Sequence, residues 1–543
     1  MTFEVLDKDL AGRIGRLKTR RGTVETPYLF PVINPFDETI MIKDIEQLGF
    51  NAFITNILHV RRAVKELNVK DVHELLSFNG PIMTDSGGYQ LLVYGRVEIT
   101  PREVIELQER HGSDIAVILD LPTGNMSHSE AKQRVDETIR RARELIDVRS
   151  DPSILWVAPI QGAPYLDLVK YCTKQLSSLE FEIYAIGSPT TIMESYRYDI
   201  LLDLIHTVKC TLTIEKPVHL FGAGHPMMLS LAVALGCDLF DSASYILYAK
   251  EHRYMTSTRT YRIDKLEYFP CSCPVCSKHS PQELNEMLEK ERTKTIALHN
   301  LYVLMSEIRS IKQSIREGTL WEYITLKSRS HPRLFSALLN FKKYVNFLEK
   351  LDPITKPRIS GLFIHDHLDS FRPEVRRHTK RLMNCLSRLQ GKVLILIPRK
   401  DDDYRFKLFL DNLIKMTCKD YIQGKVKVFI YDFPFCLVPM ELYGLYPLSQ
   451  YESPYYINCI MKHFVNSRIK SVLGKVKPKG IILYNDVNRW GNCIEDACRH
   501  VSSNVKSLIT TTPYEDPRDV DKVVSMLREI IDFNDQSNNS KLS

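Results

Sequence analysis

The sequence predicts an α/β protein whose first half forms a closed (β/α)8 barrel, and three observations carry this prediction. Eight short, continuously apolar runs occur in the first 245 residues, most neighbouring runs are separated by enough chain for one helix, and each run ends in small or polar residues. Apolar strands that alternate with helices indicate a parallel sheet buried on both faces. Eight such strands favour a closed TIM barrel, and an open doubly wound sheet is the alternative.

The predicted strands follow one another at regular intervals along the chain. They are TPYLFPVI (26–33), NAFITN (51–56), GPIMTDSG (80–87), DIAVILDLP (114–122), ILWVAPIQG (154–162), YAIGSP (184–189), PVHLFGAG (217–224) and CDLFDSAS (237–244). The intervening segment PREVIELQERHG (101–112) has apolar residues at helical spacing and a glycine just past its end, as expected of a helix between two strands.

Polar residues and glycines stand where these predicted strands end. The set is Asn56, Asp85, Asp120, Gln161, Gly187, Gly222 and Asp241. Any single member is explained equally well as a turn residue or a helix cap. All the parallel strands of a barrel end on the same face, however, and that face carries the active site in barrel enzymes. The set as a whole therefore predicts an active site.

A cysteine motif follows the last predicted strand. Cys271, Cys273 and Cys276 form C-x-C-x2-C, and His299 follows 23 residues after the last cysteine. Three thiolates and one imidazole complete a tetrahedral shell, which is typical of structural rather than catalytic zinc. A capping box at Ser280–Glu283 opens a helix that would bring His299 to the cysteines. Buried thiols, a disulfide, or His279 as fourth ligand are the alternatives.

Composition limits the class of protein. The chain has 543 residues, which suggests several domains, and 44% hydrophobic with 26% charged residues describes a globular protein. The net charge of +7 is compatible with nucleic-acid binding without requiring it. We find no membrane-spanning run and no apolar leader, so we expect a cytoplasmic protein whose cysteines are thiols or metal ligands.

The second half of the chain predicts smaller α+β domains. The stretch LDPITKPRISG (351–361) has the prolines and glycine of a boundary, and later strand–helix patterns begin near 391, 425 and 480. We therefore expect a catalytic barrel at 1–270, a zinc-binding and helical segment at 271–350, an α/β domain at 351–480 and a strand–helix segment at 481–543. No segment has the pattern of an RNA-binding PUA domain.

Two basic segments lie in this half. Residues 461–480 contain six lysines and arginines and no acidic residue, and RPEVRRHTKR (372–381) is similarly basic. Contact with RNA phosphates and an ordinary solvated helix face are both compatible with this pattern.

Four motifs together resemble the tRNA-guanine transglycosylase family. They are MTDSGGYQ (83–90), FGAGHP (221–226), FDSASY (240–245) and the CSCPVC…His299 set, in matching order across about residues 10–350. The segment VPMELYGLYPLSQYESP (438–454) is similar to the archaeal branch. The resemblance implies that guanine at position 15, in the dihydrouridine arm of tRNA, is exchanged for 7-cyano-7-deazaguanine (preQ0). This exchange is the first step of archaeosine formation.

The resemblance also implies roles for the residues at the strand ends. Asp241 would be the nucleophile that captures the ribose, and Asp85 the general acid/base that protonates the departing base. Asp120 would accept hydrogen bonds from the guanine edge. The remaining substrate-binding residues would be Ser86, Gln161, Gly187 and Ser188, and Cys271, Cys273, Cys276 and His299 would hold one structural Zn²⁺.

Two other functions stay open from the sequence. One is a paralogous archaeosine synthase that acts on the inserted base, and the other is a non-catalytic tRNA-binding subunit. The retained Asp85, Asp120 and Asp241 argue against both, because base exchange is the activity that needs them. The sequence does not decide the incoming base, since Pro189 lacks an N–H at a base-contacting position. It also does not decide between a monomer and a homodimer, or whether a separate PUA chain is needed.

Overall fold

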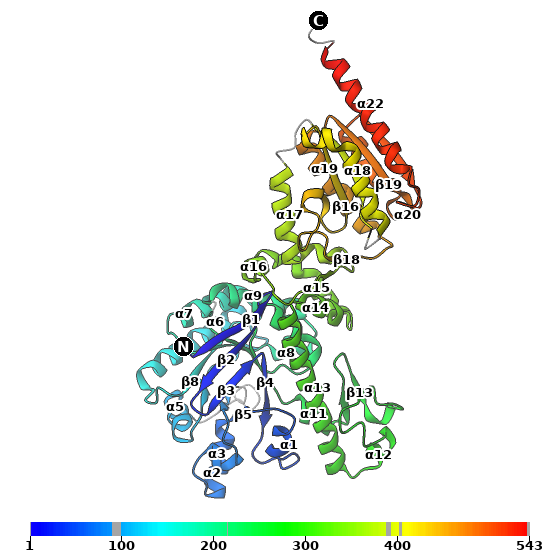
Figure 1. Ribbon diagram of the computed structural model, residues 1–543. Helices are drawn as coiled ribbons and strands as arrows, with labels where there is room; N and C mark the ends of the chain where they lie inside the picture. Colours follow the sequence, from blue (N-terminus) through cyan, green and yellow to red (C-terminus); the bar gives the residue numbers. More distant parts are fainter. Residues whose placement is uncertain (1, 89–98, 214, 387–391, 401–403, 540–543) are drawn as a thin grey trace. The chain divides into compact units, whose positions relative to one another are not determined.

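The computed structural model describes residues 2–88, 99–213, 215–386, 392–400 and 404–539. The chain divides into two compact units, Met1–Arg358 and Ile359–Ser543, each with its own sheet (Figure 1). Within the described ranges, every helix is too short or too polar to span a bilayer.

Eight parallel strands close into a barrel in the first unit, as the sequence predicts. Closure is shown by the pairing of the last strand, β11, with the first, β4, which excludes the open sheet. Every predicted run overlaps one of these strands, although β9 begins one residue before its run. They are β4 (Tyr28–Ile33), β5 (Phe53–Asn56), β6 (Ile82–Asp85), β7 (Ile115–Val117), β8 (Leu155–Ile160), β9 (Ile183–Ile186), β10 (Val218–Leu220) and β11 (Leu239–Ser242).

Helices occupy the intervals between the barrel strands. The helix α5 (Pro101–Arg110) matches the predicted one: it begins at a capping box between Thr100 and Glu103, and it buries Val104 and Ile105. The other long helices of this layer bury one apolar face in the same way. They are α2 (Ile57–Leu67), α6 (His128–Val148), α7 (Leu166–Ser177) and α9 (Tyr198–Thr211); α10 (Leu229–Ala234) is shorter and wholly buried.

An antiparallel sheet that the sequence analysis did not identify precedes the barrel. Its strands are β1 (Phe3–Asp9), β2 (Gly12–Thr19) and β3 (Gly22–Thr26). Arg13 on β2 forms an ion pair with Asp238, just before β11, and both side chains are buried. Asp238 also accepts a hydrogen bond from the Val218 N–H at 2.9 Å. This ion pair connects the antiparallel sheet to the last two strands of the barrel.

The zinc-binding and helical segment completes the first unit. It begins with a hairpin of β12 (Arg253–Met255) and β13 (Thr260–Arg262). The helix expected from residue 281 is two helices, α12 (Pro281–Glu286) and α13 (Glu289–Glu317), because Met287 and Leu288 have extended backbone with ψ of 153° and 146°. Three further helices follow: α14 (Leu320–Ser328), α15 (Pro332–Leu339) and α16 (Val345–Leu351).

Besides a two-stranded parallel sheet of β14 (Leu362–Phe363) and β18 (Tyr451–Glu452), the second unit contains one five-stranded sheet between two helical layers. The strand order is β17-β16-β15-β19-β20, with β17 alone antiparallel to its neighbour. The strands are β15 (Val393–Pro398), β16 (Val426–Asp432), β17 (Cys436–Pro439), β19 (Gly480–Asp486) and β20 (Val505–Thr510). One hydrophobic core contains residues of α17 (Pro373–Leu386), α19 (Cys459–Val476) and α21 (Cys493–Val501), and a second contains residues of α18 (Tyr404–Ile422) and α22 (Asp519–Asn539).

This sheet differs from the subdivision that the sequence suggested. We expected separate segments at 351–480 and 481–543, but β19 pairs with β15 on one side and with β20 on the other. Both segments therefore contribute strands to the same sheet, and no boundary lies at residue 480.

Candidate active site and metal centre

The carboxyl ends of the barrel strands bring the predicted polar residues to one rim. Asp85 is the last residue of β6, Asp241 lies within β11, and Asp120 follows β7. Asp241 is among the charges that raise the pKa of Asp85, and Asp85 is among those that raise the pKa of Asp120. The three carboxyl groups thus form one electrostatically connected group, although they are widely separated in the sequence.

Asp241 is hydrogen-bonded through only one of its two carboxylate oxygens. Its Oδ1 accepts from the backbone N–H of Gly222 at 3.0 Å and from Nε2 of His219 at 2.9 Å. Its Oδ2 has no hydrogen-bond partner among the residues that the structure describes. The side chain is 14% exposed, so this oxygen is accessible while the carboxylate plane is fixed.

His219 is the functional residue that the sequence analysis missed. It lies on β10 with no exposed surface, and its ring stacks against Phe30 and lies next to Phe221, with centroid distances of 6.0 and 4.7 Å. Its Nδ1 has no hydrogen-bond partner among the described residues, so we assign the proton to Nε2, the nitrogen facing Asp241. A histidine inside an apolar strand needs a buried polar partner. The histidine in the apolar run PVHLFGAG could therefore have been identified from the sequence as a candidate for such a contact.

Asp85 is positioned by Asn56 at the end of the neighbouring strand. Asn56 Oδ1 caps α2 by accepting from the Leu58 N–H at 2.9 Å, which turns its Nδ2 toward Asp85 Oδ2 at 3.2 Å. The Gly87 N–H donates to the same oxygen at 3.3 Å. Burial is the largest influence on this carboxyl group and raises its pKa to about 6. Asp85 can therefore gain and lose a proton near neutral pH.

Asp120 and Gln161 form a buried pair across the ends of β7 and β8. Gln161 Nε2 donates to Asp120 Oδ2 at 2.5 Å, and Gln161 Oε1 accepts from Ser188 Oγ at 2.8 Å. Burial raises the pKa of Asp120 to about 7, outweighing the hydrogen bond from Gln161. A side chain at Gly88 would collide with Asp120, and one at Gly187 would collide with Gln161. Both glycines are thus required for the backbone to approach these polar groups.

The remaining predicted residues lie around this pair. Ser86 is completely buried, and its hydroxyl has no hydrogen-bond partner among the described residues. Ser188 has a left-handed backbone with φ of 56°, and its hydroxyl orients Gln161. Tyr89 and Gln90 of the MTDSGGYQ motif lie outside the described residues.

The cysteine motif and His299 form a compact group of four ligand atoms. One donor atom from each of Cys271, Cys273, Cys276 and His299 lies within 4.8 Å of the others. His299 Nδ1 is 3.4 Å from the sulfur atoms of both Cys273 and Cys276. Three sulfurs and one imidazole nitrogen at this spacing fit a tetrahedral metal ion. His279, the alternative ligand, is not part of the group.

Neighbouring groups fix the orientation of these ligands. His299 Nε2 lies 2.7 Å from the Met255 carbonyl oxygen, so it carries the proton and leaves Nδ1 free as a ligand. The Tyr254 ring stacks on the imidazole at 3.7 Å, and its hydroxyl lies 3.1 Å from Cys276 Sγ. The hairpin of β12 and β13 thereby supports a metal centre whose ligands come from a loop and from α13.

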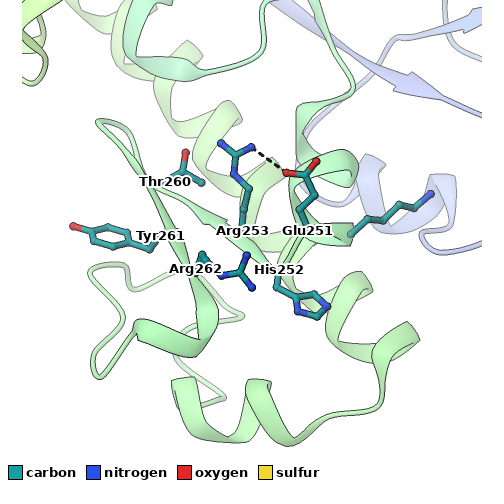
Figure 2. Close-up of a pocket in the computed structure, with 7 residues that line it drawn as sticks. Glu251, His252, Arg253, Thr260, Tyr261 and Arg262 are labelled. Carbon is teal, nitrogen blue, oxygen red and sulfur yellow. Dashed lines mark hydrogen bonds and ion pairs between the residues drawn. The ribbon is translucent and has the colours of Figure 1, made fainter. Parts of the chain in front are cut away.

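The hollow next to the hairpin is chemically different from the carboxylate rim. It has a volume of about 600 Å³ and lies beside the end of α11 (Ser244–Lys250) (Figure 2). None of the three rim aspartates lines it. Its basic residues have carboxylate partners: Arg253 with Glu251, Lys250 with Asp37, Arg262 with Asp264 and His252 with Glu289. The hollow is therefore charge-balanced, and we do not regard it as the reaction site.

The fold and the site define a TIM-barrel protein with three carboxyl groups at the carboxyl ends of its strands and a Cys₃His group that could hold a metal ion. The profile of the queuine tRNA-ribosyltransferase family matches residues 8–333, and the chain belongs to this family of pentosyltransferases, which exchange a base in tRNA. The tRNA-guanine(15) transglycosylase of Saccharolobus solfataricus is 46% identical over 83% of this chain and 90% of its own length.

Other relatives carry the same name. The tRNA-guanine(15) transglycosylase of Sulfolobus acidocaldarius is 42% identical over 87% of this chain and 93% of its own length. That of Methanocaldococcus jannaschii is 40% identical over 89% of this chain and 74% of its own length.

The raised pKa of Asp120 predicts a pH-dependent cost in stability. The pKa of this carboxyl group is 3.8 in the unfolded chain and about 7 in the folded protein. Because the unfolded chain ionises more easily, the free energy of unfolding falls as the pH rises above 3.8, and the decrease is complete above about pH 7. Asp120→Asn removes it, so the variant should be more stable than the wild type at pH 8, by up to about 4 kcal/mol. The difference should vanish near pH 4. Denaturant unfolding at both pH values measures this, and an equal difference at both would contradict the assigned pKa.

Proposed function

We propose that this protein exchanges guanine at position 15 of tRNA for preQ0 through a covalent enzyme–ribose intermediate. The observation that carries the proposal is the arrangement of the rim carboxyl groups. Asp241 presents one oxygen without a hydrogen-bond partner among the described residues, and the pKa of Asp85 is raised to about 6. A nucleophile beside a proton donor and acceptor is what a retaining displacement at a glycosidic carbon requires.

In the first half of the reaction, Asp241 Oδ2 attacks C1′ of the ribose as the bond to guanine breaks. The bond electrons pass to the base, which needs a proton, and Asp85 in its acid form supplies it. Asp241 becomes an ester of the ribose carbon. In the second half, Asp85 in its base form takes a proton from the incoming base, whose nitrogen attacks C1′ and releases Asp241. Two inversions give overall retention.

Asp120 and its surroundings supply the proposed base pocket. The Asp120 carboxylate accepts hydrogen bonds from N1–H and the exocyclic amine, which guanine and preQ0 share. Gln161 holds the carboxylate in position, and Ser86, Gly187 and Ser188 line the same region. Because Pro189 is the N-cap residue of α8 (Thr190–Glu194) and lacks an N–H, a donor to the 7-substituent must come from another residue.

We further propose that the Cys₃His group holds one structural Zn²⁺. The four ligands, without an open position, suit a metal that stabilises the fold and takes no part in the chemistry. A homodimer, a separate PUA chain and a cytoplasmic location stay predictions. An archaeosine synthase and a non-catalytic subunit are the competing functions, and the paired Asp85 and Asp241 favour base exchange over either.

The exchange reaction can be tested with radiolabelled guanine and tRNA. The wild type should incorporate label, and Asp241→Asn should lose at least about 10⁴-fold in rate because no ribosyl ester forms. Asp85→Asn should still form a complex with tRNA but exchange slowly. A wild-type protein that transfers no label would reject base exchange. A covalent RNA adduct trapped by Asp241→Asn would show that another residue is the nucleophile.

His219 should act as a positioning residue for Asp241. His219→Leu removes one of the two hydrogen bonds to Oδ1, and a charge-assisted hydrogen bond of about 1.5–3 kcal/mol corresponds to a loss of roughly tenfold to 150-fold in kcat. KM for tRNA should be unchanged, since His219 is buried away from the RNA. His219→Gln keeps an N–H donor at a similar reach and should recover much of the rate. Equal losses in both variants would indicate a packing role only.

Metal content distinguishes the two candidate histidine ligands. His299→Ala should reduce bound zinc from one per chain to well below one and lower the thermal midpoint, because metal-binding energy contributes to folding. His279→Ala is the matched control and should keep its zinc and its midpoint. Elemental analysis with thermal unfolding measures both. Full zinc occupancy in His299→Ala would exclude the Cys₃His assignment.

A further inference from the structure

The helix α19 in the second unit carries basic residues that form no ion pair with any carboxylate among the described residues. Six lysines and arginines occur between Cys459 and Lys479, and this stretch contains no aspartate or glutamate. Throughout the described part of the chain, none of these six side chains forms an ion pair with a carboxylate; Arg468 instead contacts the Phe464 ring. They are Lys462, Arg468, Lys470, Lys475, Lys477 and Lys479.

Several basic residues on α6 and those around the hollow, by contrast, have carboxylate partners. On α6, Lys132 pairs with Asp136, and Arg140 pairs with Glu137 and Glu144. Every basic residue around the hollow in Figure 2 likewise has a carboxylate partner. Unbalanced positive charge repels itself and opposes folding, so its concentration on one helix indicates an anionic partner rather than a stabilising role.

The neighbouring helix extends the positive charge. α17 packs against α19 over the same hydrophobic core and adds the basic residues Arg377, Lys380 and Arg381. Its His378 has a pKa lowered to about 4, first by burial and then by Arg381 and Arg377. The histidine is therefore neutral at physiological pH, and the positive potential of this surface comes from lysines and arginines that stay charged.

Two exposed aromatic residues precede α19. Tyr455 is 55% exposed and Tyr456 is 84% exposed, and their rings meet edge to face at 5.1 Å. Large aromatic side chains this accessible stabilise nothing within the fold, whereas they provide stacking surfaces for unpaired bases. Exposed rings next to basic residues without ion pairs fit RNA better than they fit a partner that offers only negative charge, because an RNA strand offers both bases and phosphates.

We propose that α19 and the two tyrosines before it bind the RNA substrate outside the reaction site, through Tyr455, Tyr456 and the basic residues that flank the buried side of the helix, namely Lys462, Arg468, Lys470 and Lys475. The basic side chains contact backbone phosphates without reading sequence, and the tyrosines stack on bases that are not paired. This inference rests on the proposed function, which supplies tRNA as the RNA. It assigns to the second unit a role in holding substrate that is separate from the chemistry on the barrel rim.

The charge contribution can be tested in the full-length protein by binding of unmodified tRNA across a range of KCl concentrations. In Arg468→Ala/Lys475→Ala, the slope of log affinity against log salt should fall by about two, roughly one for each phosphate contact. The matched control, Lys415→Ala/Lys419→Ala, removes the same charge from exposed positions on α18, over the other core, and should leave the slope unchanged. Equal effects in the two variants would mean general electrostatic attraction and overturn the assignment.

The stacking contribution has its own matched pair of variants. Tyr456→Ala should weaken tRNA binding roughly fivefold to a hundredfold with an unaltered salt slope, because a stacking contact neutralises no phosphate. Tyr404→Ala, a residue 74% exposed on α18, should have no effect. Because all these side chains are exposed, the thermal midpoints should match that of the wild type.

These experiments distinguish a failure of this inference from a failure of the proposed function. Wild-type base exchange together with unaltered tRNA binding in both the α19 variant and Tyr456→Ala rejects this inference and leaves the proposed function intact. A change in oligomeric state without a change in tRNA binding would also reject it, in favour of a protein partner. Loss of guanine exchange in the wild type would instead reject the proposed function.

Discussion

The pairing of β11 with β4 is the constraint on which the rest of the first unit depends. Because the sheet closes at this pair, all eight strands run in the same direction around one ring and their carboxyl ends meet at one rim. Asp85 and Asp241 are far apart in sequence, yet closure places them near enough for the charge of Asp241 to contribute to the raised pKa of Asp85. An open sheet would carry both residues at the same edge without bringing the first and last strands together.

Burial then gives similar side chains different properties. Desolvation raises the pKa values of Asp85 and Asp120 to about 6 and about 7, although both carboxyl groups also accept hydrogen bonds. Asp241 is partly exposed and accepts two hydrogen bonds from fixed donors, the Gly222 N–H and His219. A proton carrier near neutrality and an oriented carboxylate thus arise from the same residue type, because the barrel supplies each with different surroundings.

The barrel strands could be predicted because burial on both faces requires continuous apolar runs in the sequence. The residues at the barrel rim could be predicted because they stand where those runs end. The strands β1 to β3 could not be predicted, since their sequence is rich in arginine and lysine and their burial depends on partners such as Asp238. His219 was missed because its role depends on Asp241, a residue in another strand. The break between α12 and α13 and the five-stranded C-terminal sheet likewise reflect tertiary contacts that periodicity does not contain. The Cys₃His group could be predicted from residue spacing alone, because its ligands are close in sequence.

The one-sided hydrogen bonding of Asp241 has a consequence for the proposed intermediate. If Oδ2 bonds to the ribose, Oδ1 becomes the carbonyl oxygen of the ester, still facing the Gly222 N–H and His219 Nε2. When the ester breaks, negative charge returns to a carboxylate whose two donors are already in place, so the aspartate departs readily. The same donors that moderate its nucleophilicity make it a good leaving group. The arrangement therefore favours an intermediate that breaks down readily, which the exchange of one base for another requires.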